Sequence, residues 1–102
     1  MTIKKRYVRD ITTCNVTFTI DAWSTDPPKT VSLVGDFNNW NPSSIPMTRR
    51  PYGRYSKTLE LPCGKSYEFR YLLNDSDWRN DSVADRFVPT LFGDSENSVV
   101  DL

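Results

Sequence analysis

Histidine is absent from this chain of 102 residues, and cysteine occurs only twice. The missing histidines remove the commonest general base and the usual side chain that binds transition metals. Cys14 and Cys63 lie far apart in the sequence and form no CxxC pair, so we expect two reduced thiols rather than a disulfide. The composition therefore predicts a protein that holds no metal ion and no cofactor.

Net charge and long apolar runs are absent as well. The 13 basic and 13 acidic residues balance, so the chain has no excess of positive charge of the kind that binds nucleic acid. No apolar run approaches the roughly 18 residues that span a bilayer, and the first residues lack the apolar stretch of a signal peptide. We therefore expect a cytoplasmic protein that binds neither nucleic acid nor membrane. We expect the basic residues near the N-terminus to belong to a solvent-exposed lead-in segment before the domain rather than to a binding site for a polyanion. These residues are Lys4, Lys5, Arg6 and Arg9.

Apolar residues recur at every second position, which is the pattern of half-buried strands. It is clearest over 66–73, where the inward residues are expected to be Tyr67, Phe69, Tyr71 and Leu73. Further strands are predicted over 14–20, 30–34, 45–48, 54–61 and 97–102, while residues 79–96 are expected to form a long loop. No segment shows a helical stripe.

These short strands, joined by turns rich in Gly, Pro and Asn, predict an all-β fold. We expect an immunoglobulin-like (early-set) antiparallel β-sandwich of about seven strands. The length suits one domain with a single core. We assign residues 1–12 to the lead-in and residues 13–102 to the sandwich.

Carboxylates are plentiful, but a catalytic arrangement is hard to build from them. Glycoside hydrolysis needs two carboxylates held across a cleft, and strands this short offer no obvious cleft. The run from Asp75 to Asp77 begins like a calcium loop, yet Arg79 occupies the third ligand position and no bidentate Glu follows. We therefore expect no enzyme and no calcium site. The acids considered are turn formers in this interpretation: Asp75, Asp77, Asp81 and Asp85.

The three tryptophans lie at strand ends or in turns, where an aromatic ring is free to bind a ligand. A sugar ring has an apolar face and a polar rim, so its site needs exposed flat aromatics beside hydrogen-bonding groups. Trp40 is surrounded by asparagines, and Trp78 stands between Asp77 and Arg79. From composition alone the alternative stays open that these tryptophans plug the ends of the core.

Two segments together resemble a known family. They are Gly35-Asp36-Phe37-Asn38-Asn39-Trp40 and the later Tyr67-x-Phe69-Arg70-Tyr71. The pattern resembles carbohydrate-binding module family 48, and the similarity covers nearly everything from residue 14 to residue 102. This family includes the glycogen-binding domain of the AMP-activated protein kinase beta subunit and the N-terminal early-set domain of isoamylases and branching enzymes.

The resemblance implies a sugar platform made of two tryptophans with a basic residue between them. Trp40 matches the first tryptophan and Trp78 the second. Arg70 stands where the glycogen-binding members have a lysine, which keeps the charge and adds hydrogen-bond donors. Trp23 has no counterpart in the family pattern and is expected to be a packing residue.

Three further residues follow from the resemblance alone. Phe92 matches a residue of the loop that wraps the glucan before the last strand. Glu96 and Asn97 stand where the kinase domain has two asparagines, one of which contacts sugar. The sequence leaves both of these positions open.

The sequence therefore predicts non-catalytic binding of an α-1,4-linked glucan, such as glycogen, starch or a maltooligosaccharide. The alternative is a protein-interaction or regulatory early-set domain that docks on a glucan-metabolising enzyme or kinase and has little affinity for sugar. An exposed hydrophobic patch away from the tryptophans would favour this alternative. In either case we expect a monomer.

Overall fold

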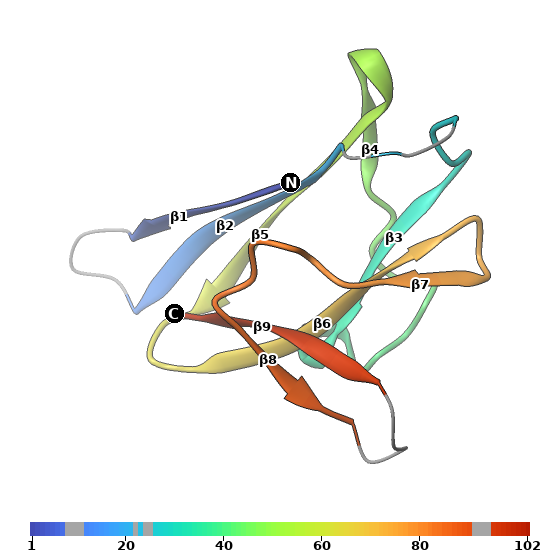
Figure 1. The fold of residues 1–102 in the computed structure, drawn as a ribbon. Coiled ribbons are helices and arrows are strands. Elements are labelled where there is room, and N and C mark those ends of the chain that lie inside the picture. Colours follow the sequence, from blue (N-terminus) through green and yellow to red (C-terminus); the bar gives the residue numbers. More distant parts are fainter. Residues whose placement is uncertain (8–11, 22, 24–25, 91–94) are drawn as a thin grey trace.

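The computed structural model describes residues 1–7, 12–21, 23, 26–90 and 95–102, which form two antiparallel sheets (Figure 1). The strands of the first sheet lie in the order β1 (Thr2–Tyr7), β2 (Thr13–Ile20), β5 (Arg54–Pro62) and β4 (Thr48–Arg50). Those of the second sheet lie in the order β3 (Val31–Gly35), β6 (Ser66–Leu73), β9 (Glu96–Asp101) and β8 (Arg86–Pro89). A short strand, β7 (Asp77–Arg79), pairs with the end of β6. None of these segments is a helix long and apolar enough to cross a membrane.

The predicted all-β sandwich is confirmed, and the described part of the chain contains nine strands rather than about seven. Residues 2–7, expected to be an unpaired lead-in, form β1 and pair with β2. The expected loop over 79–96 contains the end of β7 and all of β8. These strands escaped prediction because they are edge strands with few apolar residues, so their partners reveal them more clearly than their own pattern.

The segment predicted as a strand over 45–48 connects the two sheets. Ile45 and Met47 exchange backbone hydrogen bonds with β3, through Leu33 N–H to Ile45 O and Met47 N–H to Val31 O. From Thr48 the chain pairs with β5 instead, as strand β4. The chain therefore passes from the second sheet to the first within a few residues.

The core lies between the sheets and is rich in aromatic rings. The inward residues of β2 are fully buried, and those of β6 are buried as the alternation predicted. Phe69 lies at the centre, with ring centroids 5.0 Å from Phe18 and 5.8 Å from Tyr71, both in edge-to-face geometry. Such pairs add to the free energy of burial, and the Phe18–Phe69 pair joins the two sheets, whereas Tyr71 lies on the same strand as Phe69.

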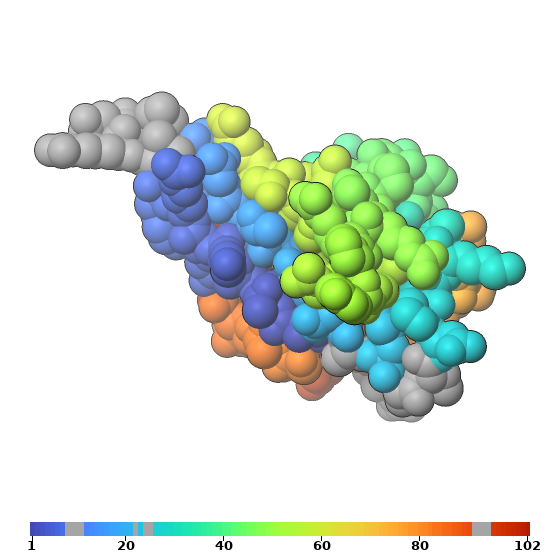
Figure 2. Space-filling view, turned by 90° about the horizontal axis from the view of Figure 1, so that it is seen from above, coloured from blue at the N-terminus to red at the C-terminus, as the bar shows by residue number. Residues whose placement is uncertain are grey.

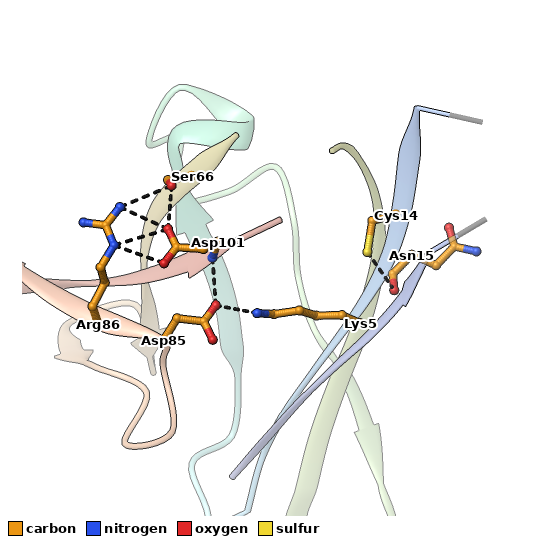
Figure 3. Close-up of polar contacts among 7 residues, drawn as sticks. All are labelled: Lys5, Cys14, Asn15, Ser66, Asp85, Arg86 and Asp101. Carbon is orange, nitrogen blue, oxygen red and sulfur yellow. Dashed lines mark hydrogen bonds and ion pairs between the residues drawn. The ribbon is translucent and has the colours of Figure 1, made fainter. Parts of the chain in front are cut away.

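One carboxylate joins the two sheets at their open edge (Figure 3). Asp85 Oδ2 accepts a hydrogen bond from Lys5 Nζ on β1 at 2.6 Å and another from the Asp101 backbone N–H on β9 at 2.7 Å. The side chain of Asp101 is in turn paired with Arg86 on β8. These hydrogen bonds thereby link β1 to β9 through Asp85.

Asp81 anchors the connection between β7 and β8. Its side chain is fully buried, and it accepts hydrogen bonds from the Tyr71 hydroxyl at 2.6 Å and from the Val83 N–H at 2.8 Å. Its backbone N–H donates to Ser98 Oγ at 2.9 Å. Burial raises the pKa of the Asp81 carboxyl above its usual value, and the two hydrogen bonds only partly oppose this shift. The folded protein therefore holds this proton more tightly than the unfolded chain.

The raised pKa of Asp81 predicts a specific pH dependence of stability. Between the unfolded and folded pKa values the folded state binds more protons, so this contribution to stability is complete below about pH 4 and falls as the pH rises. The Asp81→Asn substitution removes this pH-dependent contribution to stability. In urea unfolding from about pH 4 to pH 7, the stability of the wild type relative to the variant should therefore decrease with rising pH. A difference that stays constant or increases would contradict this assignment.

Candidate functional site

The site residues lie on the outer face of the second sheet. The alternation that turns Phe69 and Tyr71 inward turns Glu68, Arg70 and Leu72 outward. Strand β7 places Trp78 directly opposite Leu72, and therefore on the same outer face. Leu72 is buried although it faces outward, whereas 43% of Trp78 is exposed. A buried leucine thus lies opposite an exposed indole on the outer face of this sheet.

Trp40 reaches this face through a turn that begins with a close approach of two backbones. A Cβ on Gly35 would stand 2.4 Å from the Glu68 carbonyl oxygen and 2.7 Å from the Phe69 Cβ, so only glycine fits there. The turn η1 (Asp36–Asn38) follows at once. Asn39 and Trp40 then both adopt left-handed backbone conformations, with φ of 54° and 57°. Such conformations in non-glycine residues are costly and concentrate at functional sites.

Two side chains hold this turn in place. Asn38 accepts a hydrogen bond from the Gly35 N–H at 3.0 Å and donates to Leu33 O, Asn41 O and Ser44 Oγ. Asp36 accepts from the indole Nε1 of Trp40 at 2.9 Å with one oxygen and from the Glu68 N–H of β6 at 2.8 Å with the other. The Trp40 indole is therefore tied to the strand that carries Arg70.

A row of polar side chains crosses the face. Arg70 Nε donates to Asn97 Oδ1 at 2.7 Å, and Asn97 Nδ2 donates to Glu68 Oε1 at 3.1 Å. Within the described residues, the Nη groups of Arg70 have no hydrogen-bond partner. These hydrogen bonds therefore fix the orientation of the three side chains and leave other donor and acceptor atoms of Arg70 and Glu68 available to a ligand.

The two indoles and the polar row line one open cleft of about 580 Å³. The structure brings together four of the residues predicted from the sequence: Trp40, Arg70, Trp78 and Asn97. Glu96 does not line the cleft, and its backbone carbonyl instead accepts a hydrogen bond from Asn80. Geometry thus favours Asn97 where the sequence left two positions open. Phe92 lies outside the described residues.

Sequence analysis missed several residues of the site: Pro89, Thr90 and Ser95, which line the cleft beside the last strand, and two residues of the polar network. Glu68 lines the cleft and accepts a hydrogen bond from Asn97. The sequence feature that could have revealed it is its outward-facing position two residues before Arg70 on the same strand. Asp36 orients Trp40 across a turn, and no periodicity could reveal that contact.

Trp23 and the acids have other partners. Trp23 donates from Nε1 to Gly53 O at 2.7 Å and packs edge-on against Tyr55, so it is a packing residue as expected. Asp77 forms an ion pair with Arg79, and Asp81 and Asp85 have the structural roles given above. Of the acidic residues in the described ranges, Glu68 is the one that lines the cleft.

The Asp36 contacts predict that Trp40 loses its fixed orientation in Asp36→Ala. The substitution removes an acceptor from two N–H groups and should lower the free energy of unfolding by about 1–3 kcal/mol. The Nε1–H signal of Trp40 in a ¹H–¹⁵N spectrum should shift and exchange faster with solvent. Asp26→Ala is the matched control, because Asp26 is an exposed aspartate outside this network. An unchanged Trp40 signal would contradict the positioning role.

Comparison with known proteins identifies the family. The family model described as carbohydrate-binding module 48 (isoamylase N-terminal domain) matches residues 8–87, which is most of the chain. The matched region contains Trp40, Arg70 and Trp78. No curated protein sequence matches the chain closely enough to count as a relative. With the sandwich fold and this match, the chain belongs to the carbohydrate-binding module 48 family, whose members are non-catalytic carbohydrate-binding modules.

Proposed function

We propose that this protein binds α-1,4-linked glucan, such as glycogen, starch or a maltooligosaccharide, in the cleft between Trp40 and Trp78. The observation that carries the proposal is the arrangement of two supported indoles around a polar row in one open cleft. Apolar sugar faces would stack on the indoles, and ring hydroxyls would bond Arg70, Asn97 and Glu68. The tryptophans come from separate elements, a turn and the short strand β7, and the preference for an α-linked chain comes from the resemblance to the glycogen-binding members of the family.

The open shape of the cleft implies weak binding. Each glucose ring would keep one face in water, so only part of its surface contributes to the free energy of binding. We expect dissociation constants on the order of 1 mM to 1 μM for short oligosaccharides.

The alternative, a protein-docking domain with little sugar affinity, would be favoured by an apolar patch away from the tryptophans. Besides Trp78, the described residues with exposed large apolar side chains are Tyr7, Tyr52, Val83 and Phe87. No ring contact joins the aromatic ones within the described part of the chain, although the Lys5–Asp85 hydrogen bond brings the segments of Tyr7, Val83 and Phe87 to the same edge of the sandwich. We prefer glucan binding because the two indoles and the polar row line one cleft.

The test is a tryptophan-fluorescence titration with maltoheptaose or β-cyclodextrin, with cellohexaose as the control sugar. The wild type should give a saturable change with the α-linked sugars alone. Trp40→Ala and Trp78→Ala should each raise the dissociation constant at least about tenfold, since each removes a stacking surface worth more than about 1.4 kcal/mol.

Tyr52→Ala is the matched control, because it removes an aromatic ring that is 96% exposed and lies in the turn between β4 and β5 of the other sheet. It should bind the sugars as the wild type does. All variants must first show cooperative unfolding like that of the wild type. No change at millimolar sugar would overturn the glucan proposal and favour a protein partner.

A further inference from the structure

The outer face of the first sheet is polar and carries an excess of positive charge. Pairing places one set of residues from each strand on this face, from β1 across β2 and β5 to β4. In the described strands its charged residues are Lys4, Arg6, Arg50, Arg54 and Glu60. Figure 2 looks onto this side, with the blue atoms of β1 and β2 beside the yellow-green atoms of β5 and the lime-green turn η2 (Pro51–Gly53). A neutral protein thus has one face with a net charge of about +3.

Two arginines on this face oppose each other directly. Arg50 on β4 pairs in register with Arg54 on β5. Like charges at directly opposed positions destabilise a sheet. Arg50 Nε donates to Ser56 Oγ at 3.2 Å, and Arg54 Nε donates to Pro51 O at 3.4 Å. Within the described residues neither guanidinium has a carboxylate partner, so the pair lacks the counter-charge that would offset its repulsion.

Hydroxyl groups complete the surroundings of this pair. A hollow of about 300 Å³ is lined by both arginines and Pro51, together with Thr17, Thr19 and Ser56. Guanidinium groups match the paired oxygens of a phosphate, and hydroxyls supply further donors. The hollow therefore offers two delocalised cations at one place, beside the Ser56 hydroxyl, which accepts from Arg50 and keeps its own proton to donate. The Thr17 hydroxyl is paired with that of Thr58 at 2.8 Å.

We propose that the Arg50–Arg54 hollow binds a phosphate group, either free inorganic phosphate or the phosphoryl group of a phosphate monoester. The bound dianion neutralises the opposed guanidinium groups, and Lys4 and Arg6 on the same face raise the local positive potential. The hollow lies on the sheet opposite to the tryptophan cleft, so this proposal does not rest on glucan binding.

The test is an NMR titration of the full chain with inorganic phosphate at about pH 7.5, where the dianion predominates. Ionic strength is held constant with sodium chloride, so that general screening does not change. The backbone amides of Thr17, Thr19 and Ser56 should show saturable shifts. Arg50→Gln and Arg54→Gln should each raise the dissociation constant at least about tenfold, the loss expected for one charge-assisted interaction.

Arg49→Gln is the matched control, because it removes an equal charge from the same strand. The Arg49 guanidinium lies over the Tyr55 ring, 5.9 Å from its centroid, on the opposite face of β4. Phosphate binding should persist in this variant and in Trp40→Ala/Trp78→Ala. Non-saturable shifts, or equal weakening by the Arg49 and Arg54 substitutions, would overturn the site.

A parallel titration with glucose 6-phosphate distinguishes the two sources of phosphate. Equal dissociation constants would support free phosphate as the ligand, and tighter binding of glucose 6-phosphate would support a monoester. Glucose alone should leave the three amides unshifted. Shifts at these amides with glucose alone would contradict a phosphate site.

Discussion

Strand β6 is the physical constraint on which both the core and the site depend. It pairs with β3 on one side and with β9 and then β7 on the other. Its inward residues fill the core, whereas Glu68, Arg70 and Leu72 face the cleft or support it. Because side chains alternate with a period of two, a register slip of one residue would exchange these two sets. The burial of Phe69 and Tyr71 therefore also fixes where Arg70 stands relative to Trp78 and Asn97.

A single carboxylate extends this constraint to the other indole. Asp36 joins the backbone of β6 to the Trp40 side chain, so the turn and the strand act as one unit. The close approach at Gly35 and the left-handed backbone at Asn39 and Trp40 are needed to bring the indole to this place. The site is thus held by hydrogen bonds and local geometry, while a well-packed core holds the strand beneath it.

Period-two alternation was enough to predict the sandwich and the inward faces of β2 and β6, because these strands are long and half-buried. It failed for β1 and β8, which are edge strands defined by their partners. The place of Trp40 and Trp78 in turns beside polar residues marked them as candidates, the family pattern assigned them and Arg70 to sugar contact, and the structure brings the three together with Asn97. Glu68 escaped prediction because it bonds a residue far away in sequence, and Asp36 because it contacts Trp40 across an irregular turn and the backbone of a distant strand. The pairing of β1 also converted an expected solvated segment into part of a cationic sheet face.

The central claim is that Trp40 and Trp78 form the contact surface for an α-glucan, while Trp23 belongs to the packing. A ¹H–¹⁵N spectrum separates the three indole Nε1–H signals, so one titration with maltoheptaose examines all three tryptophans in the intact protein. The account predicts saturable shifts for Trp40 and Trp78, together with the backbone amide of Asn97, and an unmoved signal for Trp23. Shifts confined to Trp23, or none at saturating sugar, would contradict it.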